Sequence, residues 1–156
     1  MKTKPPAQIA AETLLGRQAY SARGLLDKLT EKGYDEPEAI AAVRRLMELG
    51  YLDDEGYARD LAASLTRRGY GARRVRQTLI AKGVDAETAD EAIPEDQDAA
   101  AAQIERWLSK LYKGKPLDAK EKSRLYGALA RRGFDGEAIR RGLRNLQNGF
   151  EDDEDF

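Results

Sequence analysis

The chain has 156 residues, of which 41% are hydrophobic and 35% are charged, a balance typical of helical proteins with a water-facing surface. It contains no cysteine and no histidine, which excludes a disulfide framework, the usual zinc sites and Ser-His catalysis, so we expect no metal or other cofactor. No apolar run approaches the roughly 18 residues of a membrane helix, and the start of the chain lacks an apolar stretch of signal-peptide length. We therefore expect a cytoplasmic protein with no membrane contact.

The formal net charge of −1 hides an uneven distribution along the chain. Residues 151–156 contain five acidic residues and no basic residue, whereas the rest of the chain contains 27 basic and 23 acidic residues, a net charge of +4. We expect residues 1–6 to be a flexible N-terminus. We expect residues 148–156 to be a disordered acidic tail, because so polar a segment cannot bury enough apolar surface to fold.

Strand patterns are almost absent, whereas helix-forming residues, caps and apolar positions at helical spacing recur along the chain. The pattern predicts nine helices, at about residues 7–19, 22–32, 36–49, 54–68, 72–82, 86–92, 95–113, 119–132 and 136–147. In the first of these helices, Ile9, Leu14 and Leu15 are expected to face the core.

A glycine, an apolar residue and an aspartate recur together at a spacing of fifty residues, in Gly33-Tyr34-Asp35, Gly83-Val84-Asp85 and Gly133-Phe134-Asp135. Each glycine follows a predicted helix, where a left-handed conformation costs it no Cβ strain. The apolar residue is placed to contact the last turn of that helix. The aspartate is expected to cap the next helix by accepting a hydrogen bond from a first-turn amide.

A repeat period of this length is typical of tandem arrays of small helical units. The sequence therefore predicts an all-α protein of three tandem three-helix repeats, at residues 7–50, 51–94 and 95–147, that form an elongated, curved array. Because a core of fewer than about 70 residues rarely supplies much stability, neighbouring repeats are expected to share apolar interfaces.

Basic residues that are not shared by all repeats are the candidate binding residues. The middle repeat has a stretch without acids that contains Arg67, Arg68, Tyr70, Arg73, Arg74 and Arg76. The third repeat adds two groups, Arg106, Lys110 and Lys113, and then Arg131, Arg132, Arg140, Arg141 and Arg144. Such cations can contact nucleic-acid phosphates or an acidic protein face, although a charge run can also be only a solvated surface. Trp107 is assigned to the core rather than to binding.

Three segments resemble the RecX family of bacterial regulators. Residues 50–58, Gly-Tyr-Leu-Asp-Asp-Glu-Gly-Tyr-Ala, are similar to the family's G-Y-[IL]-[DN]-D-x-x-[FY]-A segment, and residues 67–79 resemble its R-x-x-G-x-x-x-[IV]-x-x-x-L signature. Residues 17–33 resemble the family's opening segment, but Gly24 stands where glutamate is usual and Tyr20 where histidine is common. The resemblance covers residues 8–148 and leaves out the acidic end.

This resemblance implies a modulator rather than an enzyme. Members of the family bind the RecA recombinase, chiefly as its filament on DNA, and inhibit its ATP hydrolysis, strand exchange and co-protease activity, which links them to recombinational DNA repair and the SOS response. The basic residues named above are then candidate contacts to RecA or DNA, and a monomer with weak direct DNA binding is expected. The run from Asp53 to Glu55 is interpreted as a helix start rather than a metal site.

The alternative is a helix-turn-helix-like protein that binds nucleic acid directly and acts without RecA. Three-helix units with short corners have the right shape for that role. The modest net charge of +4 outside the acidic end, and the lack of an obvious recognition helix rich in Asn, Gln and Arg, argue against it.

Overall fold

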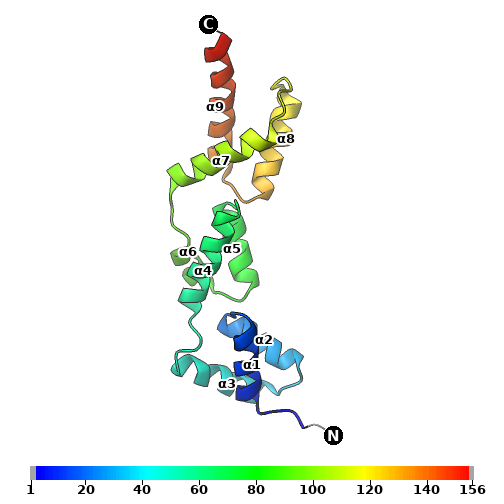
Figure 1. Ribbon diagram of the computed structural model, residues 1–156, viewed down its shortest axis with the longest axis vertical. Coiled ribbons are helices and arrows are strands. Elements are labelled where there is room, and N and C mark those ends of the chain that lie inside the picture. Colours follow the sequence, from blue (N-terminus) through cyan, green and yellow to red (C-terminus); the bar gives the residue numbers. More distant parts are fainter. Residues whose placement is uncertain (1–2, 155–156) are drawn as a thin grey trace. The chain divides into compact units, whose positions relative to one another are not determined.

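The computed structural model describes residues 3–154, with side chains described to residue 150. These residues form nine helices and no strand, which confirms the predicted all-α class (Figure 1). The helices are α1 (Ala7–Arg17), α2 (Ala22–Glu31), α3 (Glu36–Glu48), α4 (Asp54–Arg67), α5 (Ala72–Ala81), α6 (Ala86–Ala92), α7 (Gln97–Leu111), α8 (Ala119–Arg131) and α9 (Gly136–Glu154). They make up three successive three-helix repeats. Within this described part of the chain, no helix is long and apolar enough to span a bilayer.

The corner after the second helix of each repeat has the predicted geometry. The three glycines have φ values of +95°, +95° and +96°, and the residue after each glycine donates its N–H to the carbonyl five residues back: Tyr34 to Leu29, Val84 to Leu79 and Phe134 to Leu129. This is the Schellman arrangement, in which a left-handed residue satisfies the last carbonyls of a helix. The fifty-residue period is therefore a repeated helix end.

The aspartate caps are confirmed in two repeats out of three. Asp85 accepts a hydrogen bond from the Thr88 N–H at 2.8 Å, and Asp135 accepts one from Ala138 at 3.4 Å. The hydrogen bonds from Thr88 hold the pKa of Asp85 below its ordinary value. Asp35 makes no such bond. Pro37 occupies the second position of α3 and has no N–H, so one of the two amides that an N-cap side chain can bind is missing there.

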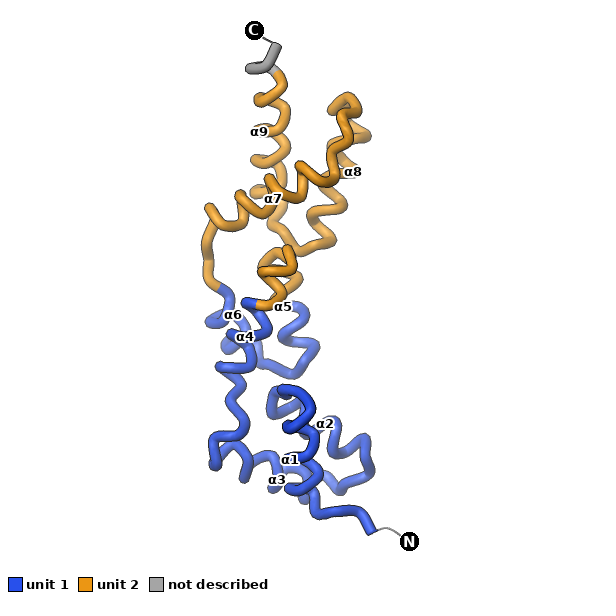
Figure 2. Tube along the Cα trace, viewed as in Figure 1, with its two compact units in different colours: residues 1–63, 76–93 blue, residues 64–75, 94–156 orange. Residues whose placement is uncertain are grey.

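The chain divides into two compact units (Figure 2). The first comprises Met1–Ala63 and Arg76–Ile93, and the second comprises Ser64–Val75 and Pro94–Phe156. The first unit therefore holds the whole first repeat and most of the middle one. The second unit holds the whole third repeat together with the turn that joins α4 to α5. Each unit is described by itself below.

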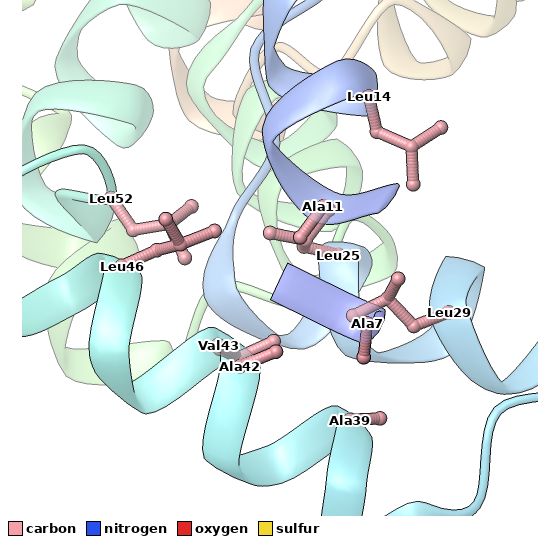
Figure 3. Packing of buried hydrophobic residues seen from close by; sticks show 10 residues of the cluster. All are labelled: Ala7, Ala11, Leu14, Leu25, Leu29, Ala39, Ala42, Val43, Leu46 and Leu52. Carbon is pink, nitrogen blue, oxygen red and sulfur yellow. The ribbon is translucent and has the colours of Figure 1, made fainter. Parts of the chain in front are cut away.

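The core of the first repeat is built from small and medium side chains of α1, α2 and α3, as Figure 3 shows. In α1 the buried positions are Ala7, Ala11 and Leu14, at helical spacings of four and three. The prediction that Ile9 faces the core is wrong, because its side chain is 51% exposed. The alanines lie on the stripe that faces the other helices, and side-chain size alone pointed to the wrong face.

The core of the third repeat uses larger side chains. Ile104 and Leu108 of α7 pack with Leu125 and Leu129 of α8, with Phe134 at the corner and with Ile139 and Leu143 of α9. Trp107 is half-buried at the margin of this cluster, as assigned.

Both ends of the described chain are more structured than the sequence suggested. Ahead of α1, the Tyr34 hydroxyl donates to the carbonyl of Pro5 at 2.7 Å and the Lys4 ammonium donates to that of Gly33 at 3.0 Å. Helix α9 continues to Glu154, past the predicted end at 147 and into the acidic segment that was expected to be disordered. Phe150 extends its apolar side, with its ring centroid 5.5 Å from that of Tyr112. Residues 155 and 156 of the predicted tail lie outside the described residues.

Candidate nucleic-acid and protein interface

In the first unit, the start of α2 docks on the end of α5. We call this contact the first joint and define it by Ser21, Gly24, Lys82 and Gly83. The buried Ser21 hydroxyl caps α2 by accepting from the Gly24 N–H at 3.0 Å, and it also donates to the Lys82 carbonyl. Asp54, from the start of α4, accepts from the Ala22 N–H at 2.8 Å. Two side chains therefore satisfy two of the first-turn amides of α2, those of Ala22 and Gly24, and join the first repeat to the middle one.

In the second unit, the start of α5 docks on the end of α8 in the same way. We call this contact the second joint and define it by Gly71, Arg73, Arg74, Arg132 and Gly133. The Gly71 N–H donates to the Arg132 carbonyl at 2.8 Å, and the Arg73 N–H donates to the Gly133 carbonyl at 3.0 Å. A Cβ atom on Gly71 would lie 2.5 Å from the carbonyl carbon and oxygen of Gly133, so only glycine allows this approach.

The second joint gathers cations of the middle and third repeats around two aromatic rings. The guanidinium groups of Arg68 and Arg74 lie 5.6 and 5.5 Å from the Tyr70 ring centroid. The Trp107 indole N–H donates to the Gly69 carbonyl at 2.8 Å. The Arg132 guanidinium lies 4.0 Å from the Trp107 ring centroid and the Lys110 ammonium 5.4 Å from it. The turn at residues 69–71 thus carries one ring, that of Tyr70, and is hydrogen-bonded to the other, that of Trp107.

We call these side chains, together with Arg67 and Arg131 next to them in the sequence, the basic cluster: Arg67, Arg68, Tyr70, Arg74, Trp107, Lys110, Arg131 and Arg132. A hydrogen bond at 3.3 Å from the Arg74 guanidinium to the Arg131 carbonyl connects its two halves. Among the described residues, no acidic side chain forms an ion pair with Arg67, Arg68, Lys110, Arg131 or Arg132. Arginines stacked on rings keep N–H groups at their edges, in a fork that fits phosphate or carboxylate oxygens.

Several predicted site residues lie outside this cluster. Arg73 pairs with Asp135 at 3.2 Å, and Arg76, which belongs to the first unit, pairs with Asp90 at 2.7 Å. Arg140 pairs with Glu137 at 3.6 Å and lies 5.6 Å from the Tyr126 ring centroid. The remaining predicted cations are exposed and form no ion pair with a described residue: Arg106, Lys113, Arg141 and Arg144.

Trp107 is the member of the cluster that sequence reasoning missed. Its ring is half-buried, so its assignment to the core is correct, but the ring also carries two cations and a hydrogen bond to the turn. Lys110 one helical turn after the tryptophan was a usable signal, because residues three apart share a helix face. Arg132 lies 25 residues further on, and nothing in the sequence placed it on the ring.

Two acidic residues, Asp54 and Glu121, make hydrogen bonds that stabilise the fold. Asp54 caps α2, and the buried Glu121 accepts two hydrogen bonds from Arg124, the shorter at 2.6 Å. The bonds from Arg124 hold the pKa of Glu121 below its ordinary value, against the opposing effect of burial. Among the side chains that the structure describes, up to residue 150, we find no group of three or more acidic side chains close enough to hold a metal ion.

The fold defines a class, the all-α proteins built from tandem three-helix repeats, and the described part of this chain carries an exposed cationic surface. The comparisons with known proteins are more specific. Models of the first, second and third three-helix domains of RecX match residues 7–46, 53–93 and 95–143. The chain belongs to the RecX family of regulatory proteins.

Individual relatives support this assignment over most of the chain. The regulatory protein RecX of Chromobacterium violaceum is 36% identical over 143 residues, which cover 92% of this chain and 90% of that protein. A regulatory protein RecX of Thermus thermophilus is 39% identical over 121 residues, 78% of each chain. The crystal structure of RecX from Lactobacillus salivarius has the same fold, with a TM-score of 0.81 at 20% identity, and the match covers 90% of this chain and 94% of that one.

The family-like segment at residues 50–58 lies beside the first joint, because its Asp54 accepts a hydrogen bond from the Ala22 N–H. Leu52 and Ala58 are buried, and Asp54 between them caps α2. Tyr57 is half-buried, and this burial, together with the Asp54 carboxylate, raises the pKa of its hydroxyl. The segment at residues 67–79 contributes Gly71 to the second joint. In both segments, residues of the signature serve to join one repeat to the next.

Proposed function

We propose that this protein binds the RecA recombinase on DNA and inhibits its ATP hydrolysis, strand exchange and co-protease activity, and so modulates recombinational repair and the SOS response. The observation that carries the proposal is membership of the RecX family over nearly the whole chain. One relative is 36% identical over 92% of this chain. The protein acts without chemistry of its own, as a monomer in the cytoplasm. Its working part is a binding surface.

The basic cluster is the part of that surface that we assign to the filament. Arg68, Arg74 and Arg132 are held by Tyr70, Trp107 and backbone carbonyls, so less side-chain entropy is lost when they bind an oxyanion. DNA phosphates and acidic side chains of RecA are the two oxyanions that a filament offers. A chain of repeats that contacts adjacent RecA subunits would oppose the rearrangement that ATP turnover requires.

The test is the DNA-dependent ATPase of RecA, measured with increasing amounts of the protein. Inhibition that saturates is expected, and its absence at several-fold excess over RecA would contradict the proposal. The variant R67Q/R68Q/R131Q removes three cations of the basic cluster that form no ion pair with a described residue and should weaken inhibition about tenfold. The matched control R23Q/K28Q/R45Q removes three cations that are already paired in the first unit, and it should inhibit like the parent protein.

Direct DNA binding is the second candidate, because rings that carry cations are also the usual platform for unpaired bases. The same variants distinguish the two candidates when binding to single-stranded DNA is measured without RecA. Binding to DNA alone should be weak and should fall steeply with salt. Tight binding to DNA together with unchanged RecA activity would favour the second candidate.

A further inference from the structure

The first unit contains a groove between the end of α1 and the start of α4, with a volume of about 860 Å³. Residues from Glu12 to Tyr20 form one side of the groove, and residues between Tyr51 and Asp60 form the other. All of them belong to the first unit. The groove is therefore separate from the basic cluster, which belongs to the second unit.

The lining of the groove is acidic and aromatic. Its carboxylates are Glu12, Asp53 and Asp60, and Arg17 is its one basic side chain. The three carboxylates are exposed, and none forms an ion pair with a described residue.

Three tyrosines complete the lining: Tyr20, Tyr51 and Tyr57. The side chain of Tyr51 is 67% exposed, whereas a tyrosine side chain that only packs in a core is usually more buried. Carboxylates beside accessible ring faces are the groups that attract a guanidinium or ammonium ion.

In the second unit, side chains bridge the corresponding space. Between the end of α4 and α7, the Gln103 amide donates to the Thr66 carbonyl at 2.9 Å and Trp107 donates to the Gly69 carbonyl at 2.8 Å. A guanidinium, that of Arg132, then covers the indole ring. In the first unit, the space between the end of α1 and α4 has rings and carboxylates around an open groove.

We propose that this groove binds an arginine or lysine side chain from a basic segment of a partner protein. The cation lies over a tyrosine ring and pairs with Asp53 or Asp60, as Arg132 lies over Trp107 in the second unit. This site has the opposite charge to the basic cluster and does not depend on the function proposed above. The protein accordingly has two recognition surfaces, one for oxyanions and one for cations.

The test uses a heptapeptide of alternating glycine and arginine, titrated into the isotopically labelled full-length protein and followed by amide chemical shifts. Gly16 and Gly56 line the groove and are its reporters. Saturable shifts at both are expected, and the same peptide with citrulline in place of arginine should produce none. The variant E12Q/D53N/D60N should bind about tenfold more weakly. It keeps a good helix cap, because asparagine replaces aspartate at residue 53.

The control variant E31Q/E87Q/E91Q removes three exposed acids outside the groove and should bind the peptide as the parent protein does. Y51A is a second test that changes little in the fold, since this side chain is mostly exposed, and it should weaken binding severalfold. Equal loss of affinity in the two triple variants would overturn the proposal. So would shifts confined to the acidic residues near the C-terminus, or no shifts at Gly16 and Gly56 at millimolar peptide.

Discussion

The first and second joints place the same backbone elements together with different side chains. In each joint, the start of the second helix of one repeat meets the glycine corner of the next repeat. At the first joint a hydroxyl, that of Ser21, binds the Lys82 carbonyl. Fifty residues later the corresponding position is Gly71, and its backbone N–H binds the corresponding Arg132 carbonyl directly.

This difference changes how close the two backbones are. A Cβ atom on Gly83, at the first joint, would lie 2.8 Å from the Arg23 Cβ atom, whereas one on Gly133, at the second joint, would lie 2.3 Å from the Arg74 nitrogen. The tighter joint is also the one that gathers the basic cluster. A carbonyl that must be satisfied can thus be reached by a side chain or by the main chain, and the choice decides which neighbouring groups come together.

The largest effect is expected from alanine at the corner glycines. All three have nearly the same φ, so the backbone strain of about 1–2 kcal/mol is common to them. Gly133→Ala adds a clash with the Arg74 backbone and should lower the free energy of unfolding by about 3–4 kcal/mol in total. Gly83→Ala should cost about 2–3 kcal/mol. Gly33→Ala should cost only the strain, about 1–2 kcal/mol, because its new methyl group meets the movable end of Lys4. Urea denaturation followed by circular dichroism gives the order, and equal losses would contradict it.

The next largest loss in the free energy of unfolding is expected when the residue that distinguishes one joint is replaced by its counterpart in the other. Gly71→Ser introduces a Cβ atom 2.5 Å from the Gly133 carbonyl group and should cost about 2–3 kcal/mol. The fluorescence of Trp107, the only tryptophan, reports unfolding at this joint. If Gly71→Ser leaves the urea midpoint of this unfolding transition unchanged, the close backbone approach is not required for stability.

At the first joint, Ser21→Ala removes the cap of α2 and the hydrogen bond to the Lys82 carbonyl. A cap and a buried hydrogen bond are each worth about 1 kcal/mol, so a loss of about 2 kcal/mol is expected. Ser21→Thr keeps the hydroxyl and serves as a partial control. A loss below about 0.5 kcal/mol for Ser21→Ala would mean that water replaces the serine.

Arg132→Met tests the stacked guanidinium at the second joint. The variant keeps an unbranched side chain on Trp107 but loses the charge and the hydrogen bond to the Ala128 carbonyl at 3.1 Å, so it should cost about 1 kcal/mol. The tryptophan emission should change with it. Arg131→Met is the matched control, because no ring contact or ion pair of Arg131 is found among the described residues, and it should change neither quantity.

The smallest effect is a pH dependence in the third repeat. Hydrogen bonds from Arg124 hold the pKa of Glu121 below its ordinary value of 4.5. The ionised carboxylate therefore stabilises the fold above the ordinary pKa, and this contribution is lost as the pH falls through the lower folded pKa. Glu121→Gln should show a shallower fall in Tm on acidification than the parent, whereas Glu137→Gln, in an exposed pair, should follow the parent curve. If the parent and both variants show the same dependence of Tm on pH, the ionised Glu121 carboxylate does not stabilise the fold.

Much of the fold was predictable because its signals are local. The glycine corners and the apolar spacing depend on residues within a few positions of one another, and the recurrence of the corners every fifty residues predicted the three-repeat division. The errors came where size or composition misled. Ile9 was placed inside because it is large, and the acidic composition hid the continuation of α9 through Phe150.

The candidate site was predictable only as a list of cations. The sequence alone identified the arginine-rich turn between α4 and α5 and named Arg131 and Arg132. Tertiary structure decided that Arg68 and Arg74 share Tyr70, that Arg132 lies on Trp107, and that Arg73 and Arg76 are paired with acids. The physical reason is range. A helix end is specified by neighbours in the chain, whereas a joint depends on a backbone contact across about sixty residues, such as that between Gly71 and Arg132.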